Sequence, residues 1–250
     1  MVSSRTPPEG KIISEQGGRK ISSLDDERIA KIDFSVSHQE AENIRFIRKH
    51  TTIPVPEVFD SYDTDNGSHC IIMAHVSGST LEQAWPDLSD ESKSGILTEL
   101  IGYIHQLRRF QGTSVSSASG SPTGMYVFGS SLEEVLQSPS QFHDFITSKV
   151  YPEISKHYIS YLRSRLDDNS RLLFTHGDLV ARNIFIENGK ISCIVAWGSA
   201  GYYPEHWEFV QFMTHVAWPL GFGKRMVAEF PEYNDAYLTC TILQTISKST

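Results

Sequence analysis

The dipeptide Asn188-Gly189 is the feature that most narrows what this 250-residue chain can fold into. It separates two runs rich in β-branched and other apolar residues, 184–187 and 190–195. Asn-Gly readily adopts the positive φ angles of a two-residue turn, so these runs are predicted to form an antiparallel hairpin. Another apolar run, 172–174, precedes the polar stretch 175–183. That stretch is therefore predicted to be a loop held between a strand and a rigid hairpin.

The predicted loop carries three candidate catalytic residues. They are His176, Asp178 and, five positions after the aspartate, Asn183. Phosphoryl transfer needs a carboxylate at the attacking hydroxyl and an amide oxygen at the phosphate-bound Mg²⁺. The kinase pattern H-R-D-x-x-x-x-N has the same spacing. A motif this short also arises in unrelated chains, so it needs support from elsewhere. His176 is expected to order the loop through hydrogen bonds rather than to titrate.

The chain changes character near residue 75. Before that point we expect strands with one helix, and after Gly78 mainly helices. The predicted strands are 11–14, 19–23, 28–33, 58–62 and 70–76, with a hairpin turn at Gly17-Gly18 and a helix over 37–50 capped by Ser35 or Ser37. Later helices are predicted after the cap Ser89 and over 131–149 and 152–167, with a loop at 112–124. The fold class is therefore α+β, with a small antiparallel sheet lobe joined near residues 74–80 to a larger, mostly helical lobe.

Composition excludes several classes of partner. Hydrophobic residues make up 39% of the chain, enough for a core, and the formal net charge is −8. An acidic surface with interspersed charges predicts binding to neither nucleic acid nor an anionic membrane. The three cysteines are far apart and odd in number, which predicts neither a disulfide framework nor a zinc site. With no signal peptide or apolar span evident, we expect a cytoplasmic protein; the oligomeric state stays open.

Several longer segments resemble one known family. The run THGDLVARNIFIENGKISCIVAWGSAGYYPEHWEF, 175–209, is similar to the catalytic region of the aminoglycoside phosphotransferase and choline kinase superfamily, especially its fungal branch. Similar runs are EAENIRFIRKHTTIPVPEVFD, IIMAHVSGSTLEQAW and LSDESK. The resemblance implies a two-lobed protein-kinase-like fold, with a nucleotide-binding lobe over 1–75 and the catalytic loop and acceptor pocket over 76–250. It also implies ATP and Mg²⁺ as cofactors and a small hydroxyl-bearing molecule as substrate.

The same resemblance assigns roles to residues outside the loop. Lys31 matches the lysine that contacts ATP phosphates, and Glu40 its ion-pair partner, with Glu42 as a competitor for that role. Met73 and His75 match the hinge that holds adenine. Within the loop, Asp178 matches the catalytic base and Asn183 a metal ligand.

One position departs from the family pattern. The second metal-binding aspartate of the family falls on Ala196, and a methyl group cannot coordinate a hard cation. The alanine is compatible with a natural loss and with a deliberate substitution. Three functions remain open: an impaired ATP-dependent phosphotransferase, a pseudokinase-type binding or regulatory module, or an enzyme of small-molecule metabolism that uses Asp178 and His176 for acid–base chemistry without ATP.

Overall fold

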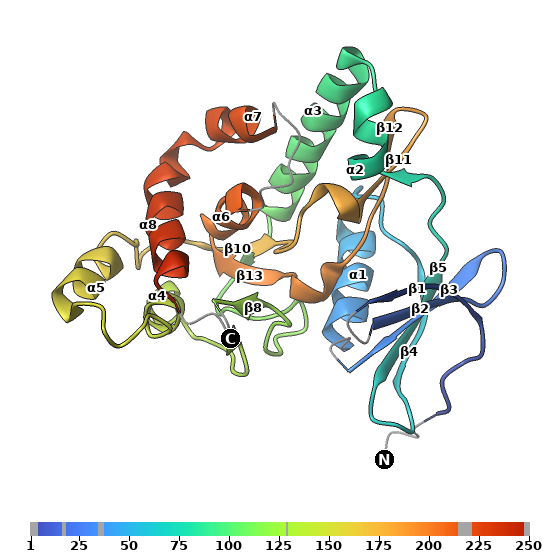
Figure 1. The fold of residues 1–250 in the computed structure, drawn as a ribbon, viewed down its shortest axis with the longest axis horizontal. Coiled ribbons are helices and arrows are strands. Elements are labelled where there is room, and N and C mark those ends of the chain that lie inside the picture. Colours follow the sequence, from blue (N-terminus) through green and yellow to red (C-terminus); the bar gives the residue numbers. More distant parts are fainter. Residues whose placement is uncertain (1–4, 17–18, 35–37, 129, 215–221, 248–250) are drawn as a thin grey trace.

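The N-terminal part of the chain is an antiparallel sheet with one long helix beside it (Figure 1). The computed structural model describes residues 5–16, 19–34, 38–128, 130–214 and 222–247. The sheet has the strand order β1-β2-β3-β5-β4. Its elements are β1 (Lys11–Gln16), β2 (Arg19–Ser23), β3 (Arg28–Asp33), α1 (His38–His50), β4 (Val58–Asp63) and β5 (His69–Ala74). The predicted antiparallel lobe with one helix is confirmed.

The register of this sheet decides which side chains share a face. On β3 and β5, Lys31 pairs with Ile71 and Asp33 with His69. His69 also pairs with Asp63 on β4. Directly opposite residues point to the same face of a sheet. Since Lys31 contacts a residue of α1, that face is the one covered by the helix.

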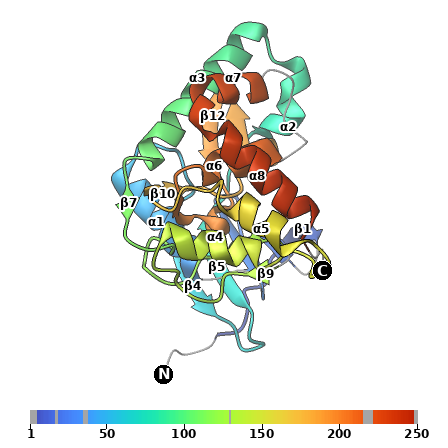
Figure 2. The same cartoon turned by 90° about the vertical axis from the view of Figure 1, so that its left-hand side faces the viewer.

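The rest of the chain is mostly helical, with short sheets at its centre. The longer helices are α3 (Asp90–Leu107), α4 (Pro139–Thr147), α5 (Lys156–Arg163), α6 (Trp207–Thr214), α7 (Phe222–Glu229) and α8 (Asn234–Thr245), with α2 at Leu81–Ala84. The strands are β6 (Ser79–Thr80), β7 (Gln111–Gly112), β8 (Tyr126–Val127), β9 (Ser130–Ser131), β10 (Leu172–Thr175), β11 (Ile184–Glu187), β12 (Lys190–Ile194) and β13 (Gly201–Pro204). Figures 1 and 2 show α4, α5 and α8 at the side remote from the N-terminal sheet. No helix in the described segments is both long and apolar enough to cross a lipid bilayer.

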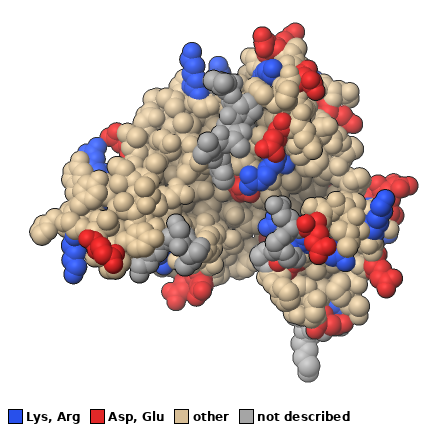
Figure 3. All heavy atoms as spheres, viewed as in Figure 1, with Lys and Arg blue, Asp and Glu red and all other residues tan. Residues whose placement is uncertain are grey.

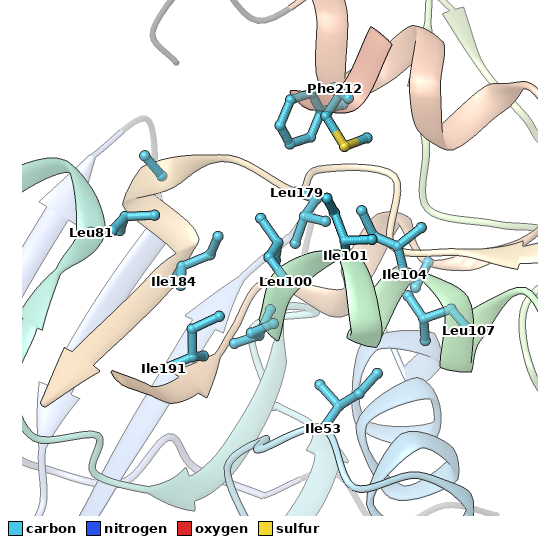
Figure 4. Close-up of a cluster of buried hydrophobic side chains, with 14 of the residues drawn as sticks. Ile53, Leu81, Leu100, Ile101, Ile104, Leu107, Leu179, Ile184, Ile191 and Phe212 are labelled. Carbon is cyan, nitrogen blue, oxygen red and sulfur yellow. The ribbon is translucent and has the colours of Figure 1, made fainter. Parts of the chain in front are cut away.

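The largest core cluster lies beneath the predicted loop and hairpin. Residues of α3 such as Leu100 and Ile104 pack with Leu179 of the loop and Ile184 of β11 (Figure 4). Ile44 of α1 belongs to the same cluster. Burying each such side chain stabilises the fold by about 1.5–3 kcal/mol. The loop therefore rests on the largest buried cluster among the described residues.

The predicted helices at 131–149 and 152–167 are too long. The first begins only at Pro139, where Ser138 caps it by accepting from the backbone N–H of Gln141. A residue before proline is pushed out of the helical region, so the helix cannot extend upstream through Ser138. The second spans only Lys156–Arg163. By contrast, Ser89 caps α3, and β11 pairs with β12, as predicted. The predicted turn at Gly17-Gly18 and the caps at Ser35 and Ser37 lie outside the described residues.

Candidate functional site

The loop between β10 and β11 is held in shape by a glycine. Gly177 has φ 79°, in the left-handed region that favours glycine. A Cβ at this position would lie 2.7 Å from the carbonyl oxygen of Ser199. A side chain at 177 would therefore push the loop away from the segment that follows Ala196.

Asp178 and Asn183 contact each other within this loop. The Asn183 side-chain amide donates to the carbonyl oxygen of Asp178, at 2.8 Å, and to Asp178 Oδ2, at 2.9 Å. Arg182 forms an ion pair with Asp178 Oδ1 at 3.1 Å. The backbone of Asn183 is fixed as well, because its carbonyl accepts from the N–H of Val195. The structure thus brings together the aspartate and the asparagine of the motif, and Arg182 pairs with the Asp178 carboxylate.

His176 is buried and uses both ring nitrogens within the site. Its Nε2 lies 3.0 Å from the carbonyl oxygen of Val195, and its Nδ1 accepts from the backbone N–H of Asp178 at 3.1 Å. One donating and one accepting nitrogen define a neutral imidazole. Burial lowers the pKa of His176, which also keeps it neutral. The geometry gives this ring a positioning role and leaves neither nitrogen for a substrate.

Glu208 is a site residue that sequence reasoning missed. It lies buried on α6 and accepts from the backbone N–H of His176 at 2.5 Å. Burial raises the pKa of Glu208 to about 7. A single acidic residue inside the aromatic run Trp207-Glu208-Phe209 was the available signal, since a buried carboxylate needs hydrogen-bond partners.

Lys31 and Glu40 form the expected contact. The Lys31 Nζ lies 2.6 Å from Glu40 Oε1 and 2.7 Å from Oε2. Only 11% of the lysine side chain and 5% of the glutamate side chain are exposed. Glu40, rather than Glu42, is the partner of the lysine. What the pair does in the protein stays a prediction.

Two adjoining cavities open between the sheet lobe and the helical lobe. Each has a volume of about 370–390 Å³, and both are lined by Arg19, Lys31, Glu40 and Ala196. The first also contains Asp178, Gly177, Tyr126 and Gln211 in its wall, and is largely polar. Figure 3 shows the molecule hollowed between the lobes, with charged side chains of both signs at the hollow. Asp178 therefore faces the interlobe cleft.

The second cavity is more apolar and contains the predicted hinge. Its wall includes Ile21, Ile29, Met73, His75 and Asn183. Met73 is buried on β5, and the backbone N–H of His75 donates to the carbonyl of Glu27 at 2.7 Å. Asn183 lines this cavity and Asp178 the other, so the loop that carries both residues lies where the two cavities join.

Ala196 keeps an unusual backbone conformation. It has φ 66° and ψ 50°, the left-handed region in which aspartate and asparagine are enriched among residues other than glycine. Its neighbour Trp197 is buried, and so are Tyr203 and Trp207. These aromatics belong to the core, while Ala196 itself lines both cavities. The backbone at Ala196 therefore has a conformation that aspartate could also adopt.

Asn43 is the second residue that sequence reasoning missed. This fully buried side chain of α1 donates to the carbonyls of Trp197 and Ala200, both at 2.9 Å. Its oxygen accepts from the N–H of Ala118 at 3.0 Å. It therefore connects the helix carrying Glu40 to the segment after Ala196. An amide in the stretch Ala41 to Ile44 gave little signal, because helices commonly carry exposed asparagines.

Comparisons with known proteins agree on one family. Residues 24–240 match the model of the phosphotransferase enzyme family, APH. The aminoglycoside phosphotransferase APH(4)-Ia is similar in structure, with a TM-score of 0.67 and 13% identity over 94% of this chain and 83% of that one. A thermostable mutant of that enzyme in a ternary complex with AMP-PNP and hygromycin B gives 0.68 and 12%, with the same coverage.

A second aminoglycoside phosphotransferase shares the architecture. The GDP and kanamycin complex of APH(2")-IIia has a TM-score of 0.61 and 14% identity, over 93% of this chain and 80% of that one. Curated protein sequences give no match. At such low identities the structural likeness shows a shared kinase-like fold.

Proposed function

The chain belongs to the phosphotransferase enzyme family, and from this we propose that it binds ATP between its lobes and transfers a phosphoryl group to a small-molecule hydroxyl. The observation that carries the proposal is the buried Lys31–Glu40 pair in the wall that the two interlobe cavities share. A rigid cation at this place is suited to phosphate oxygens. The rate is expected to be low, because Ala196 supplies no ligand to the metal.

The apolar cavity fits a nucleotide base. Ile21, Ile29 and Met73 offer flat apolar surface, and Lys31 lies at the end next to the catalytic loop. The N–H of His75 already donates to the carbonyl of Glu27, while the backbone of Val76 makes no hydrogen bond with another described residue. We therefore assign the polar edge of the base to the backbone of Val76, with Met73 and His75 as the surrounding wall.

Asp178 is the group placed to take a proton. Its carboxylate lies in the wall of the polar cavity, where a bound hydroxyl can reach it. The proton of the hydroxyl would pass to an Asp178 carboxylate oxygen as the hydroxyl oxygen attacks the γ-phosphorus of ATP; the bond from that phosphorus to the β–γ bridging oxygen breaks, and ADP leaves. Arg182 and Asn183 hold that carboxylate in place from two sides. His176 fixes the loop and takes no proton in this scheme.

The residues fit a magnesium ion only in part. Asn183 offers a side-chain oxygen, and Mg²⁺ also accepts substrate phosphates and water as ligands. When bound, the metal neutralises charge on the transferring phosphoryl group. Ala196 leaves one oxygen ligand fewer than the family pattern has, which lowers metal affinity and rate. A loss of roughly 10²–10⁴ in rate is expected for an electrostatic contributor of this kind.

A second candidate function follows from the same alanine. If the missing ligand abolishes turnover, the chain acts as a pseudokinase-type module that binds nucleotide and regulates a partner. A third, acid–base chemistry without ATP, is less favoured, because both nitrogens of His176 are engaged within the loop.

The acceptor is proposed to be a small polyhydroxyl compound. Structural neighbours are complexes with hygromycin B and with kanamycin, which are aminoglycosides. The polar cavity of about 370 Å³ contains Asp178, Glu40 and Gln211. These side chains suit a molecule rich in hydroxyl or amino groups. The three cysteines of the protein are free thiols, which fits the cytoplasmic location that we expect.

Calorimetric titration with ATP, with and without Mg²⁺, tests nucleotide binding first. Transfer of the γ-phosphate is then measured with a panel of aminoglycosides and other polyols. Turnover that is lost in Asp178→Asn and kept in the exposed control Asp26→Asn supports the phosphotransferase. Binding without turnover supports the pseudokinase. Failure to bind ATP under either condition overturns both and leaves chemistry without a nucleotide.

A further inference from the structure

Three side chains with metal-ligand chemistry meet at one end of β4 and β5, outside the two interlobe cavities. They are His38, the first residue of α1, Asp63, the last of β4, and His69, the first of β5. One ligand atom from each lies within 4.8 Å of the other two. We propose that His38, Asp63 and His69 bind a single divalent transition-metal ion of the Zn²⁺ class. Sequence spacing predicts no such site, because the first two ligands are 25 positions apart.

The sheet register assembles the cluster. His69 pairs with Asp63 on one side and with Asp33 on the other. The side chains of Asp33, His69 and Asp63 therefore form a row on the face of the sheet that α1 covers. His38 meets this row from the start of the helix, with its ring 4.0 Å from that of His69 between centroids. The N-terminus of α1 carries a partial positive charge, and this charge alone would disfavour a cation. The negative carboxylates of Asp33 and Asp63 oppose it.

The distances suit a tetrahedral ion. Two ligands bound at about 2.05 Å from zinc lie about 3.3 Å apart at the tetrahedral angle. His38 Nε2 lies 3.4 Å from Asp63 Oδ1. His69 Nδ1 lies 2.8 Å from the same oxygen, a hydrogen-bond distance that must open by about 0.5 Å when metal replaces the proton. His38 and Asp63 are each 52% exposed, so they can adjust and leave the fourth position to water.

His69 and Asp63 are in protonation states that are compatible with metal binding. Burial lowers the pKa of His69, so its imidazole is neutral at pH 7. The hydrogen bond from His69 lowers the pKa of Asp63, which is therefore ionised. Metal ligands must be in these forms. When a metal binds at Nδ1, the single N–H of the neutral ring moves to Nε2, where Ser61 Oγ is its partner.

A supporting contact orients the buried histidine. Ser61 Oγ lies 2.8 Å from His69 Nε2, the nitrogen that would not hold the metal. A ligating histidine usually donates its other N–H to such an acceptor. The turn between β4 and β5 is fixed too, since Thr64 hydrogen-bonds to Asn66 and Ser68. Imidazole ligands select Zn²⁺ and its neighbours over Mg²⁺, which prefers oxygen ligands only.

Titration of chelator-treated protein with Zn²⁺ by calorimetry tests the site, with Co²⁺ absorption as a report on geometry. We expect one ion per chain and a four-coordinate cobalt spectrum without a thiolate charge-transfer band. His38→Asn and Asp63→Asn should each weaken Zn²⁺ binding by at least the 10- to 100-fold that loss of an outer partner already costs. Zn²⁺ should also raise the melting temperature of the wild type and of neither variant.

His157→Asn is the matched control, because His157 is an exposed histidine on α5 remote from the cluster. It should bind Zn²⁺ as the wild type does. Because His38 and Asp63 are half exposed, both variants should fold, and their circular dichroism checks this. Unchanged Zn²⁺ affinity in the two cluster variants, or a wild type that binds no ion, overturns the proposal. Neither result bears on the proposed phosphotransferase, whose cleft is separate.

Discussion

The side-chain amide of Asn43 lies 2.9 Å from the carbonyl oxygen of Trp197, so α1 is bonded directly to the segment that follows Ala196. The amide donates two hydrogen bonds and accepts one, and all three partners are backbone groups of the helical lobe. A fully buried amide with three backbone partners is costly to remove, because each partner is left without a replacement.

Asn43→Ala is therefore expected to destabilise the protein strongly. Each orphaned buried group costs about 1–3 kcal/mol, so the free energy of unfolding should fall by roughly 3 kcal/mol or more. Urea unfolding measures this. Arg45→Ala on the same helix, at an exposed position, should change it by about 0.5 kcal/mol at most. Equal effects of the two variants would contradict the role assigned to Asn43.

Ala196→Asp should fold well and restore metal-dependent nucleotide binding. The backbone at this position already has a conformation that aspartate tolerates better than alanine. One recovered ligand should strengthen Mg²⁺-dependent ATP binding by about 1–3 kcal/mol, or roughly 5- to 150-fold. Calorimetry at fixed Mg²⁺ provides the measurement.

Ala196→Gly distinguishes the effect of removing backbone strain from the effect of adding a metal ligand. Glycine removes the left-handed strain, worth about 1–2 kcal/mol, but adds no oxygen. It should raise stability and leave the response of ATP binding to Mg²⁺ unchanged. If glycine and aspartate alter nucleotide binding alike, metal ligation is not the cause.

Replacing only Lys31 or only Glu40 should lower the free energy of unfolding more than replacing both residues together. A lone buried charge left by Lys31→Met or Glu40→Leu destabilises by about 3–5 kcal/mol. The double variant leaves no unpaired charge and should be more stable than either single variant. Urea unfolding of all four proteins completes the cycle. ATP affinity should fall in every variant that lacks Lys31, whatever its stability.

Glu208 should give stability a distinctive pH dependence. Its pKa is about 7 in the folded protein, against 4.5 ordinarily. Between these values the folded state holds a proton that the unfolded state has released, so this contribution to stability is complete below pH 4.5 and lost as pH rises through 7. Glu208→Gln should remove a slope of up to about 1.4 kcal/mol per pH unit.

Urea unfolding from pH 5 to 8 tests this by comparing Glu208→Gln with wild type. The buried histidines titrate with the opposite sign, but they are present in both proteins and cancel in the difference. Glu153→Gln, at an exposed position, should leave the profile unchanged. A difference between Glu208→Gln and wild type that stays constant with pH would rule out titration of Glu208.

Local patterns predicted much of this fold. Asn188-Gly189 indicated the β11–β12 hairpin, and the change of period near residue 75 indicated a sheet followed by helices. The loop motif predicted that Asp178 and Asn183 lie close together, and they do, because the two residues are only five positions apart in one short loop. Helix ends were harder to predict, since the apolar pattern before Pro139 continues although the backbone there is not helical.

The residues that sequence reasoning missed depend on distant partners. Asn43 meets segments more than 70 positions away, and Glu208 meets His176 across 32. No local period records such pairings. The lone carboxylate between Trp207 and Phe209 was a visible warning of a buried polar group, whereas a helical asparagine was not.

The packing of α1 has a mechanical consequence. The helix follows the sheet in sequence, yet Ile44 lies in the main core, Phe46 contacts Phe174 of β10, and Asn43 binds the segment after Ala196. The helix is therefore anchored in the helical lobe, and any opening of the cleft would strain its contacts with the sheet, where Ala41 packs with Ile71 and Met73. Among those contacts are the Lys31–Glu40 ion pair and the approach of His38 to Asp63, so opening the cleft would load both at once.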